Sequence, residues 1–286
     1  MLTLLFDGIA YGMLLFVLAV GLAVTLGLMN FVNLAHGAFA MAGGYVTVLL
    51  MERAGVPFLA TLPLAFLIPA AIGAVAERTL YRPMYKRPHL DHVLFSIGIV
   101  FMTVAAVDYV VGSQQQIIKL PEFLQGRFEV AGVGIGRYRL FIIAVCLVLT
   151  AILQLILART RFGSRLRAAV DDARVAAGLG INVNQVFSIT FAVGSGLAGL
   201  GGALGAEVLG LDPSFPLKFM IYFLIVVSVG GTTTITGPLL AALLLGIADV
   251  MGKYYVPQLG AFVVYTLMVA ILFWRPQGLF GRAATK

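Results

Sequence analysis

Apolar stretches of membrane-spanning length alternate with short polar loops along the whole chain. Long apolar runs begin near Leu4, Phe58, Val93, Leu140 and Val186. Each is close to the roughly 20 residues that cross a bilayer as a helix. Shorter runs bring the total to about eight or nine hydrophobic segments. The pattern predicts an all-α protein, a polytopic transmembrane helical bundle that forms one domain over residues 1–286.

Two places interrupt the apolar pattern and predict broken or re-entrant helices, near residues 29–45 and 230–238. They contain these polar and small residues: Asn30, Asn33, His36 and Gly37 in the first, and Thr232, Thr233 and Thr234 in the second. Polar groups at membrane depth need partners or a water-lined cavity, so both segments are candidates for the translocation pathway. Each also has a simpler interpretation. The asparagines can cap helices at the membrane surface, with His36 merely interfacial, and the threonine hydroxyls can cap the helix ends of a hairpin turn.

The apolar run from about Val186 to Leu209 carries a small residue at every fourth position. These residues are Gly194, Ala198, Gly202, Ala206 and Gly210. Small side chains at this interval let helix backbones approach closely in a membrane. We therefore expect this run to pack in the interior of the bundle.

Basic residues cluster between the apolar runs. Four lie in residues 78–87, five in residues 159–174 and three in the carboxyl tail, which accounts for 12 of the 19. Cationic loops are retained on the cytoplasmic side, so nine spans place the amino terminus outside and the carboxyl terminus in the cytoplasm. Eight spans, with residues 30–45 re-entrant, would place both termini on one side unless another segment also changes its class. Because the charge sits between membrane spans, the net charge of +7 reflects topology rather than nucleic-acid binding.

The loop at about residues 159–185 combines arginines with a predicted short helix. Asp171 and Asp172 can cap the amino end of that helix, residues 173–177 are compatible with one or two turns, and Gly178 or Gly180 can end it. A short helix on a basic cytoplasmic loop is shaped to lie in a groove of another protein. The alternative is an ordinary loop that only stops membrane transfer.

Enzyme motifs are absent from the sequence. There is no G-x-x-x-x-G-K-[ST] for ATP hydrolysis, no G-x-S-x-G and no H-E-x-x-H. His89 and His92 lack a third firm ligand, so we predict neither a metal site nor a cofactor. The single cysteine, Cys146, excludes an intrachain disulfide and is expected to be a small core residue. Energy for any transport must come from another subunit.

Several strings, taken together, resemble the permease subunits of ABC importers of the branched-chain amino acid type. In chain order they are "NFVNLAHGAFAMAGGY", "ERTLYRPM", "SRLRAAVDDARVAAGLGINVNQV", "FAVGSGLAGLGGAL", "GGTTTITGP" and "RPQGLFG". The resemblance covers nearly the whole chain. It implies a non-enzymatic transport subunit of the bacterial inner membrane that imports leucine, isoleucine or valine. The implied partners are a second, similar permease, two cytoplasmic ATPase subunits that bind the ATP, and a periplasmic solute-binding protein.

The resemblance also implies roles for particular residues. The family's coupling helix, which docks on the ATPase, falls on Arg167, Ala168, Asp171, Asp172, Ala177, Gly180 and Ile181. Asn33, His36 and Gly37 match the family's first-hairpin motif near the translocation path. One departure concerns the general ABC permease pattern, in which an acidic residue precedes two alanines, because Arg167 stands at that place here.

Two other functions remain open on the sequence. The same kind of ABC permease can carry urea, short amides or another amino acid, because specificity in such importers lies largely in the binding protein. A self-contained secondary transporter or channel is a more distant alternative.

Overall fold

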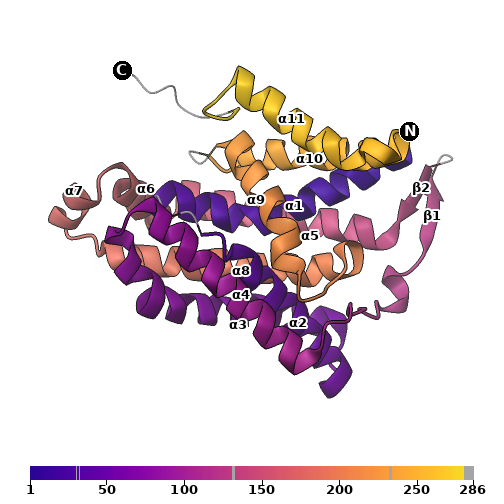
Figure 1. The fold of residues 1–286 in the computed structure, drawn as a ribbon, viewed down its shortest axis with the longest axis horizontal. Helices are drawn as coiled ribbons and strands as arrows, with labels where there is room; N and C mark the ends of the chain where they lie inside the picture. The colour runs from indigo at the N-terminus through magenta and orange to yellow at the C-terminus, as the bar shows by residue number, and fades with distance from the viewer. Residues whose placement is uncertain (30, 32, 131–132, 232–233, 280–286) are drawn as a thin grey trace.

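The computed structural model describes the chain except for residues 30, 32, 131–132, 232–233 and 280–286. Most of the described chain is helical (Figure 1). The first half contains α1 (Leu2–Met29), α2 (His36–Ala54), α3 (Phe58–Ala76), the π-helical turn η1 (Glu77–Tyr81), the 3-10 turn η2 (Arg82–Lys86), α4 (His89–Val111), η3 (Glu122–Leu124), β1 (Arg127–Val130) and β2 (Val133–Gly136). The second half contains α5 (Arg137–Arg159), α6 (Arg161–Asp171), α7 (Ala173–Gly178), α8 (Val183–Leu209), α9 (Phe215–Gly230), α10 (Thr236–Tyr255), η4 (Pro257–Leu259) and α11 (Gly260–Trp274).

Length and composition make the described chain a polytopic helical membrane protein, as the apolar pattern predicted. Six helices are long and apolar enough to cross a bilayer, and α9 and the apolar part of α11 are shorter apolar helices. Large apolar side chains such as Leu67, Met102 and Leu147 are exposed on α3, α4 and α5. In a membrane this surface faces apolar surroundings, where exposing such side chains carries no cost.

The helices run mostly along the long axis of the molecule (Figure 1). The short helices α6 and α7 lie at one end, and the antiparallel hairpin of β1 and β2 lies at the other, near the amino terminus. The long helices α1 and α8 are the most buried of the six long apolar helices. They form the centre around which the other elements pack.

Small residues bring α8 close to its neighbours. A Cβ atom added to Gly43 of α2 would overlap the backbone of Gly199, and one added to Gly21 of α1 would overlap the backbone of Gly194. Backbones that approach this closely gain dispersion contacts along their whole length, which is the main packing force available between helices in lipid. The interior position expected for the run from Val186 to Leu209 is confirmed.

Both predicted interruptions are present. Helix α1 ends at Met29 and α2 begins at His36. Helix α9 ends at Gly230, Gly231 has a φ of 80°, and α10 begins at Thr236. The positive φ of Gly231 is a conformation that only glycine adopts without strain, so this residue ends α9 at a fixed place.

Cys146 of α5 is fully buried in the main apolar core, as expected for a small core residue.

Candidate functional site

The arginine-rich segment folds into two helices rather than one. Thr160 caps α6 by accepting a hydrogen bond from the Gly163 N–H at 3.3 Å. Leu166 and Ala169 are buried on one face of α6 against Val186 of α8, while arginines lie on the exposed face. The sequence pattern had predicted only the shorter second helix. Helix α6 was not predicted because its buried apolar face contains only two or three residues, and these are buried only by contact with α8.

The sequence predicted Asp171 or Asp172 as the amino-terminal cap of α7, and Asp172 makes the capping hydrogen bonds. The Oδ1 atom of Asp172 accepts hydrogen bonds from the N–H groups of Arg174 at 2.8 Å and Val175 at 3.0 Å. Asp171 is instead the last residue of α6. Gly180, with a φ of 84°, follows the end of α7. Of the two aspartates proposed as caps, Asp172 is therefore the cap.

The exposed face of α7 is partly apolar. Val175 is 59% exposed and Leu179, just after the helix, is 77% exposed, whereas Ala176 is buried. The residues assigned to the coupling helix by resemblance are spread over this region: Arg167, Ala168 and Asp171 on α6, Asp172 between the helices, Ala177 on α7, and Gly180 and Ile181 after it. The segment of residues 160–181, which we call the docking segment, thus offers apolar side chains among exposed arginines.

Asn33 and His36 lie in the interior of the bundle, at the start of α2. The Nε2 atom of His36 donates a hydrogen bond to the Leu18 carbonyl oxygen at 2.9 Å. Because Leu18 is near the middle of α1, α2 begins inside the bundle rather than at its end. Asn33 Oδ1 accepts hydrogen bonds from the Ala35 N–H at 3.1 Å and the Tyr81 hydroxyl at 3.2 Å. Both polar side chains therefore have protein partners, as burial requires.

Of the other residues predicted for the pathway, the structure describes only Gly37 and Thr234. Gly37 packs against Pro216 at the start of α9. Thr234 lies in the break before α10, where its hydroxyl accepts a hydrogen bond from the Gly237 N–H at 3.3 Å. This contact is the hydroxyl cap that the simpler interpretation described. Asn30, Thr232 and Thr233 lie outside the described residues.

Four of the five small residues predicted for close packing lie on α8 and are buried there, namely Gly194, Ala198, Gly202 and Ala206. A Cβ atom on Gly202 would overlap the Ala40 carbonyl of α2. Gly210 differs from the expectation, because α8 ends at Leu209 and Gly210 has a φ of 76°. Gly210 therefore ends α8 and is not one of its packing residues. A Cβ atom built on it would meet the Gln115 side chain.

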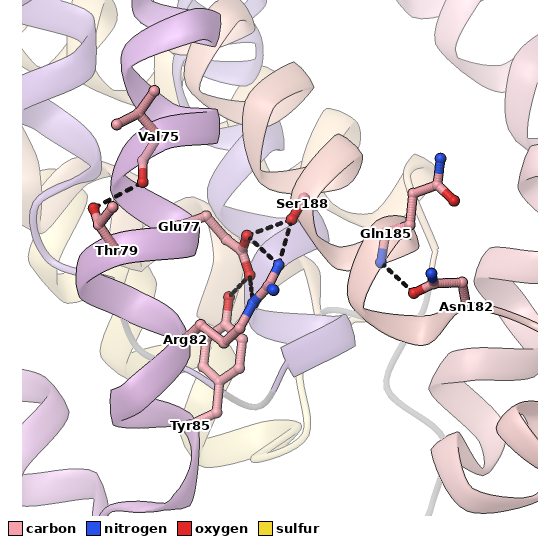
Figure 2. Close-up of polar contacts among 8 residues, drawn as sticks. All are labelled: Val75, Glu77, Thr79, Arg82, Tyr85, Asn182, Gln185 and Ser188. Carbon is pink, nitrogen blue, oxygen red and sulfur yellow. Dashed lines mark hydrogen bonds and ion pairs between the residues drawn. The ribbon is translucent and has the colours of Figure 1, made fainter.

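A buried carboxylate joins η1 to α8 (Figure 2). The Glu77 side chain is fully buried and accepts hydrogen bonds from Arg82 Nη2 at 3.1 Å, from the Tyr85 hydroxyl at 3.1 Å and from the Ser188 hydroxyl. Arg82 Nη2 also donates to Ser188 Oγ at 2.8 Å. Arg82 is partly exposed, so its guanidinium links the buried carboxylate to the outside of the bundle.

This cluster was not predicted from the sequence. Residues 77–87 were interpreted as a cationic loop, which is the usual meaning of four basic residues after an apolar run. The available signal was Glu77 itself, the one acid at the start of the "ERTLYRPM" string, followed five residues later by Arg82. Ser188 could not be recognised from the sequence, because a serine inside an apolar helix can simply bond the backbone of its own helix.

Within the described residues, no group of three or more histidine, cysteine, aspartate or glutamate side chains is arranged to hold a metal ion. The buried side chains of Asn33, His36 and Glu77 are instead paired with other side chains or with the backbone.

A bundle of apolar helices, broken twice and carrying an exposed arginine-bordered segment at one end, defines a multi-pass membrane subunit of the transport class. The family described as the branched-chain amino acid transport system permease component matches residues 4–272. The chain belongs to this family, and it is a transport subunit without an ATPase site or cofactor of its own.

Similar proteins match almost the whole of this chain. The permease protein BraD of the high-affinity branched-chain amino acid transport system of Pseudomonas aeruginosa is 28% identical, over 97% of this chain and 95% of BraD. The permease LivH of Escherichia coli is 26% identical, over 97% of this chain and 94% of LivH. The permease LivM of Escherichia coli is 26% identical, over 93% of this chain and 68% of LivM. No solved structure gives a significant match.

Proposed function

We propose that this chain is one half of the translocation unit of an ATP-driven importer that carries leucine, isoleucine and valine. The observation that carries the proposal is the family match over residues 4–272, together with relatives of the same length whose names specify branched-chain amino acids. The absence of a phosphate-binding loop from the sequence agrees with a subunit that is driven from outside. The chain acts as a single transmembrane permease domain in the bacterial inner membrane.

The same comparison supports the proposed partners. LivH and LivM are two permease proteins of one transport system in Escherichia coli, and both resemble this chain. A second, similar permease is therefore the proposed partner within the membrane. Two cytoplasmic ATPase subunits supply the energy, and a periplasmic solute-binding protein delivers the amino acid.

The docking segment is the proposed contact with an ATPase subunit. Its exposed apolar side chains, Val175 and Leu179, lie beside exposed arginines, which is the mixed surface that a protein groove accepts. The short helix α7 is too short to be stable alone, so it relies on its cap and on its neighbours to keep this surface in place. The coupling role covers Arg167, Ala168, Asp171, Asp172, Ala177, Gly180 and Ile181.

The break between α1 and α2 is proposed to border the translocation pathway. Asn33, His36 and Gly37 support this role because a helix that begins inside the bundle places polar backbone and side-chain groups at membrane depth. Asn30 and the threonines at 232–234 belong to the same proposal by their position in the sequence.

Uptake by the complete importer tests the cargo. The chain, its partner permease, the ATPase subunits and the binding protein are reconstituted in proteoliposomes with ATP on the ATPase side. We expect uptake of radiolabelled leucine that requires both ATP and the binding protein. Uptake of urea in place of leucine supports the alternative cargo, and uptake by the chain alone along an ion gradient supports a secondary transporter.

A further inference from the structure

We propose that Glu77 and Tyr81, on the π-helical turn η1, are positioning residues that transmit movement of the docking segment to the break between α1 and α2. This inference rests on the proposed function and names the residues that connect the ATPase contact to the translocation pathway. It is carried by an unbroken series of contacts from α6 through α8 and η1 to Asn33.

The first contact joins the docking segment to α8. Leu166, Ala169 and Val186 form a small apolar core of their own, separate from the main core, and Phe187 packs against it. A core shared by α6 and the first turns of α8 resists separation, because its members lose burial when the helices part. A push on the docking segment therefore moves the beginning of α8.

The second contact joins α8 to η1. The Ser188 hydroxyl donates to the Glu77 carboxylate, and Arg82 bridges the two, while Tyr85 donates to the same carboxylate from the other side (Figure 2). A fully buried carboxylate is stable only while its donors surround it. The turn η1 must then follow Ser188 when α8 moves, since separation leaves the charge without partners.

The third contact joins η1 to the start of α2. Tyr81 is fully buried, its ring centroid lies 4.7 Å from that of Phe191 on α8, and its hydroxyl donates to Asn33 Oδ1. The same Oδ1 atom accepts the Ala35 N–H, one residue before His36. The position of Tyr81 therefore sets the position from which α2 begins.

The turn that carries both residues is a π-helix. Such turns are rare, and they are frequent at functional sites. Here the two ends of the turn contact different neighbours. Glu77 is hydrogen-bonded to α8, and Tyr81 is hydrogen-bonded to the segment before α2. An α-helical continuation of α3 would change the direction of one of them.

The test compares energy use with transport in the reconstituted importer. Tyr81→Phe removes one hydroxyl and keeps the ring, and Glu77→Gln keeps the shape of the side chain and removes its charge. We expect both variants to retain ATP hydrolysis while leucine uptake per ATP falls about tenfold, within the range of known coupling between sites. Thr79→Val is the matched control on the same turn, because among the described residues the Thr79 hydroxyl donates to the Val75 carbonyl of the preceding turn and to no neighbouring helix, so the ratio should stay unchanged.

A second measurement does not depend on the cargo. Spin labels at Glu52→Cys on α2 and at Gln258→Cys on η4, an exposed position outside both the docking segment and the link, report the movement of α2 by their separation in the assembled importer, without nucleotide and with ATP and vanadate. We expect a nucleotide-dependent change in the otherwise unaltered protein and in the Thr79→Val variant, and none in the Tyr81→Phe and Glu77→Gln variants.

The outcomes separate the two proposals. An unaltered importer that shows the nucleotide-dependent change but takes up no leucine contradicts the proposed cargo and leaves the link supported. Variants that keep the change in separation, or that lose ATP hydrolysis and uptake in parallel, overturn the link while the transport function stands. An unaltered importer with no change in separation also overturns the link.

Discussion

Gly202 shows how little space the centre of the bundle allows. The backbone of α8 approaches that of α2 so closely that even a methyl group at this position meets the Ala40 carbonyl. Backbone atoms cannot rotate away as a flexible side chain can. Any larger residue must push the two helices apart, which in a packed core costs about 1–3 kcal/mol or more.

We therefore predict that Gly202→Leu abolishes transport although the protein still inserts into the membrane. The apolar substitution suits the translocation machinery, but the helices around α8 cannot pack at their native distance. Membrane fractionation measures insertion, and leucine uptake measures transport. Gly98→Leu on α4 is the control, because among the described residues no atom beyond its chain neighbours and the nearby backbone of its own helix lies within 4 Å of a Cβ built there. Normal uptake by the Gly202 variant would show that this close approach is dispensable.

The same scale shows what the sequence revealed about single residues. The interval of small residues predicted the buried face of α8, because that pattern has one main physical use in lipid. It included Gly210 wrongly, since a glycine after a helix and a glycine within it look alike in the sequence. Glu77 was passed over for a related reason. Its importance comes from Ser188, a residue far away in the chain, and only the fold brings the two together.

Among the elements, α7 depends most on a single side chain. It has six residues, and a helix this short cannot hold itself together from its own hydrogen bonds. Asp172 satisfies two backbone N–H groups that otherwise lack partners. Removing such a cap costs about 1 kcal/mol.

We predict that Asp172→Ala opens α7 while leaving the bundle intact. Hydrogen exchange of residues 173–178 should become roughly fivefold faster, which corresponds to the loss of about 1 kcal/mol. Asp171→Ala is the matched control, because it removes the same charge from the neighbouring position, where no capping bond is made to α7. Equal exchange in the two variants would mean that charge, rather than the cap, supports the helix.

Elements were predictable where a long periodic or apolar run defined them. The spans and both breaks followed from run length and from polar residues within apolar sequence. The helix α6 and the turn η1 were not predicted. In both, charged residues dominate the local sequence, and the structure is decided by contacts with α8 that the local sequence does not contain.

At the scale of the whole molecule, the docking segment and the β hairpin lie at opposite ends (Figure 1). The distribution of basic residues predicts that the docking end faces the cytoplasm. Orientation and attachment to the ATPase can therefore be examined at the same two places.

We predict that a cysteine at Ala173 reacts with a membrane-impermeant maleimide only from the cytoplasmic side, and that bound ATPase subunits protect it. Ala173 is exposed at the start of α7, and the docking role places it beneath those subunits. A cysteine at Gln125, an exposed residue near the hairpin, is the control and should react only from outside. The reverse pattern of labelling would invert the orientation and remove the basis of the docking proposal.

Cys146 has a practical consequence for all of these experiments. It is the only thiol in the 286 residues, and it is sealed inside the bundle on α5. Maleimide and spin-label reagents that work from water cannot reach it while the protein stays folded. The natural chain therefore does not react with these thiol reagents. Each introduced cysteine reports on its own position, and Cys146 does not have to be replaced.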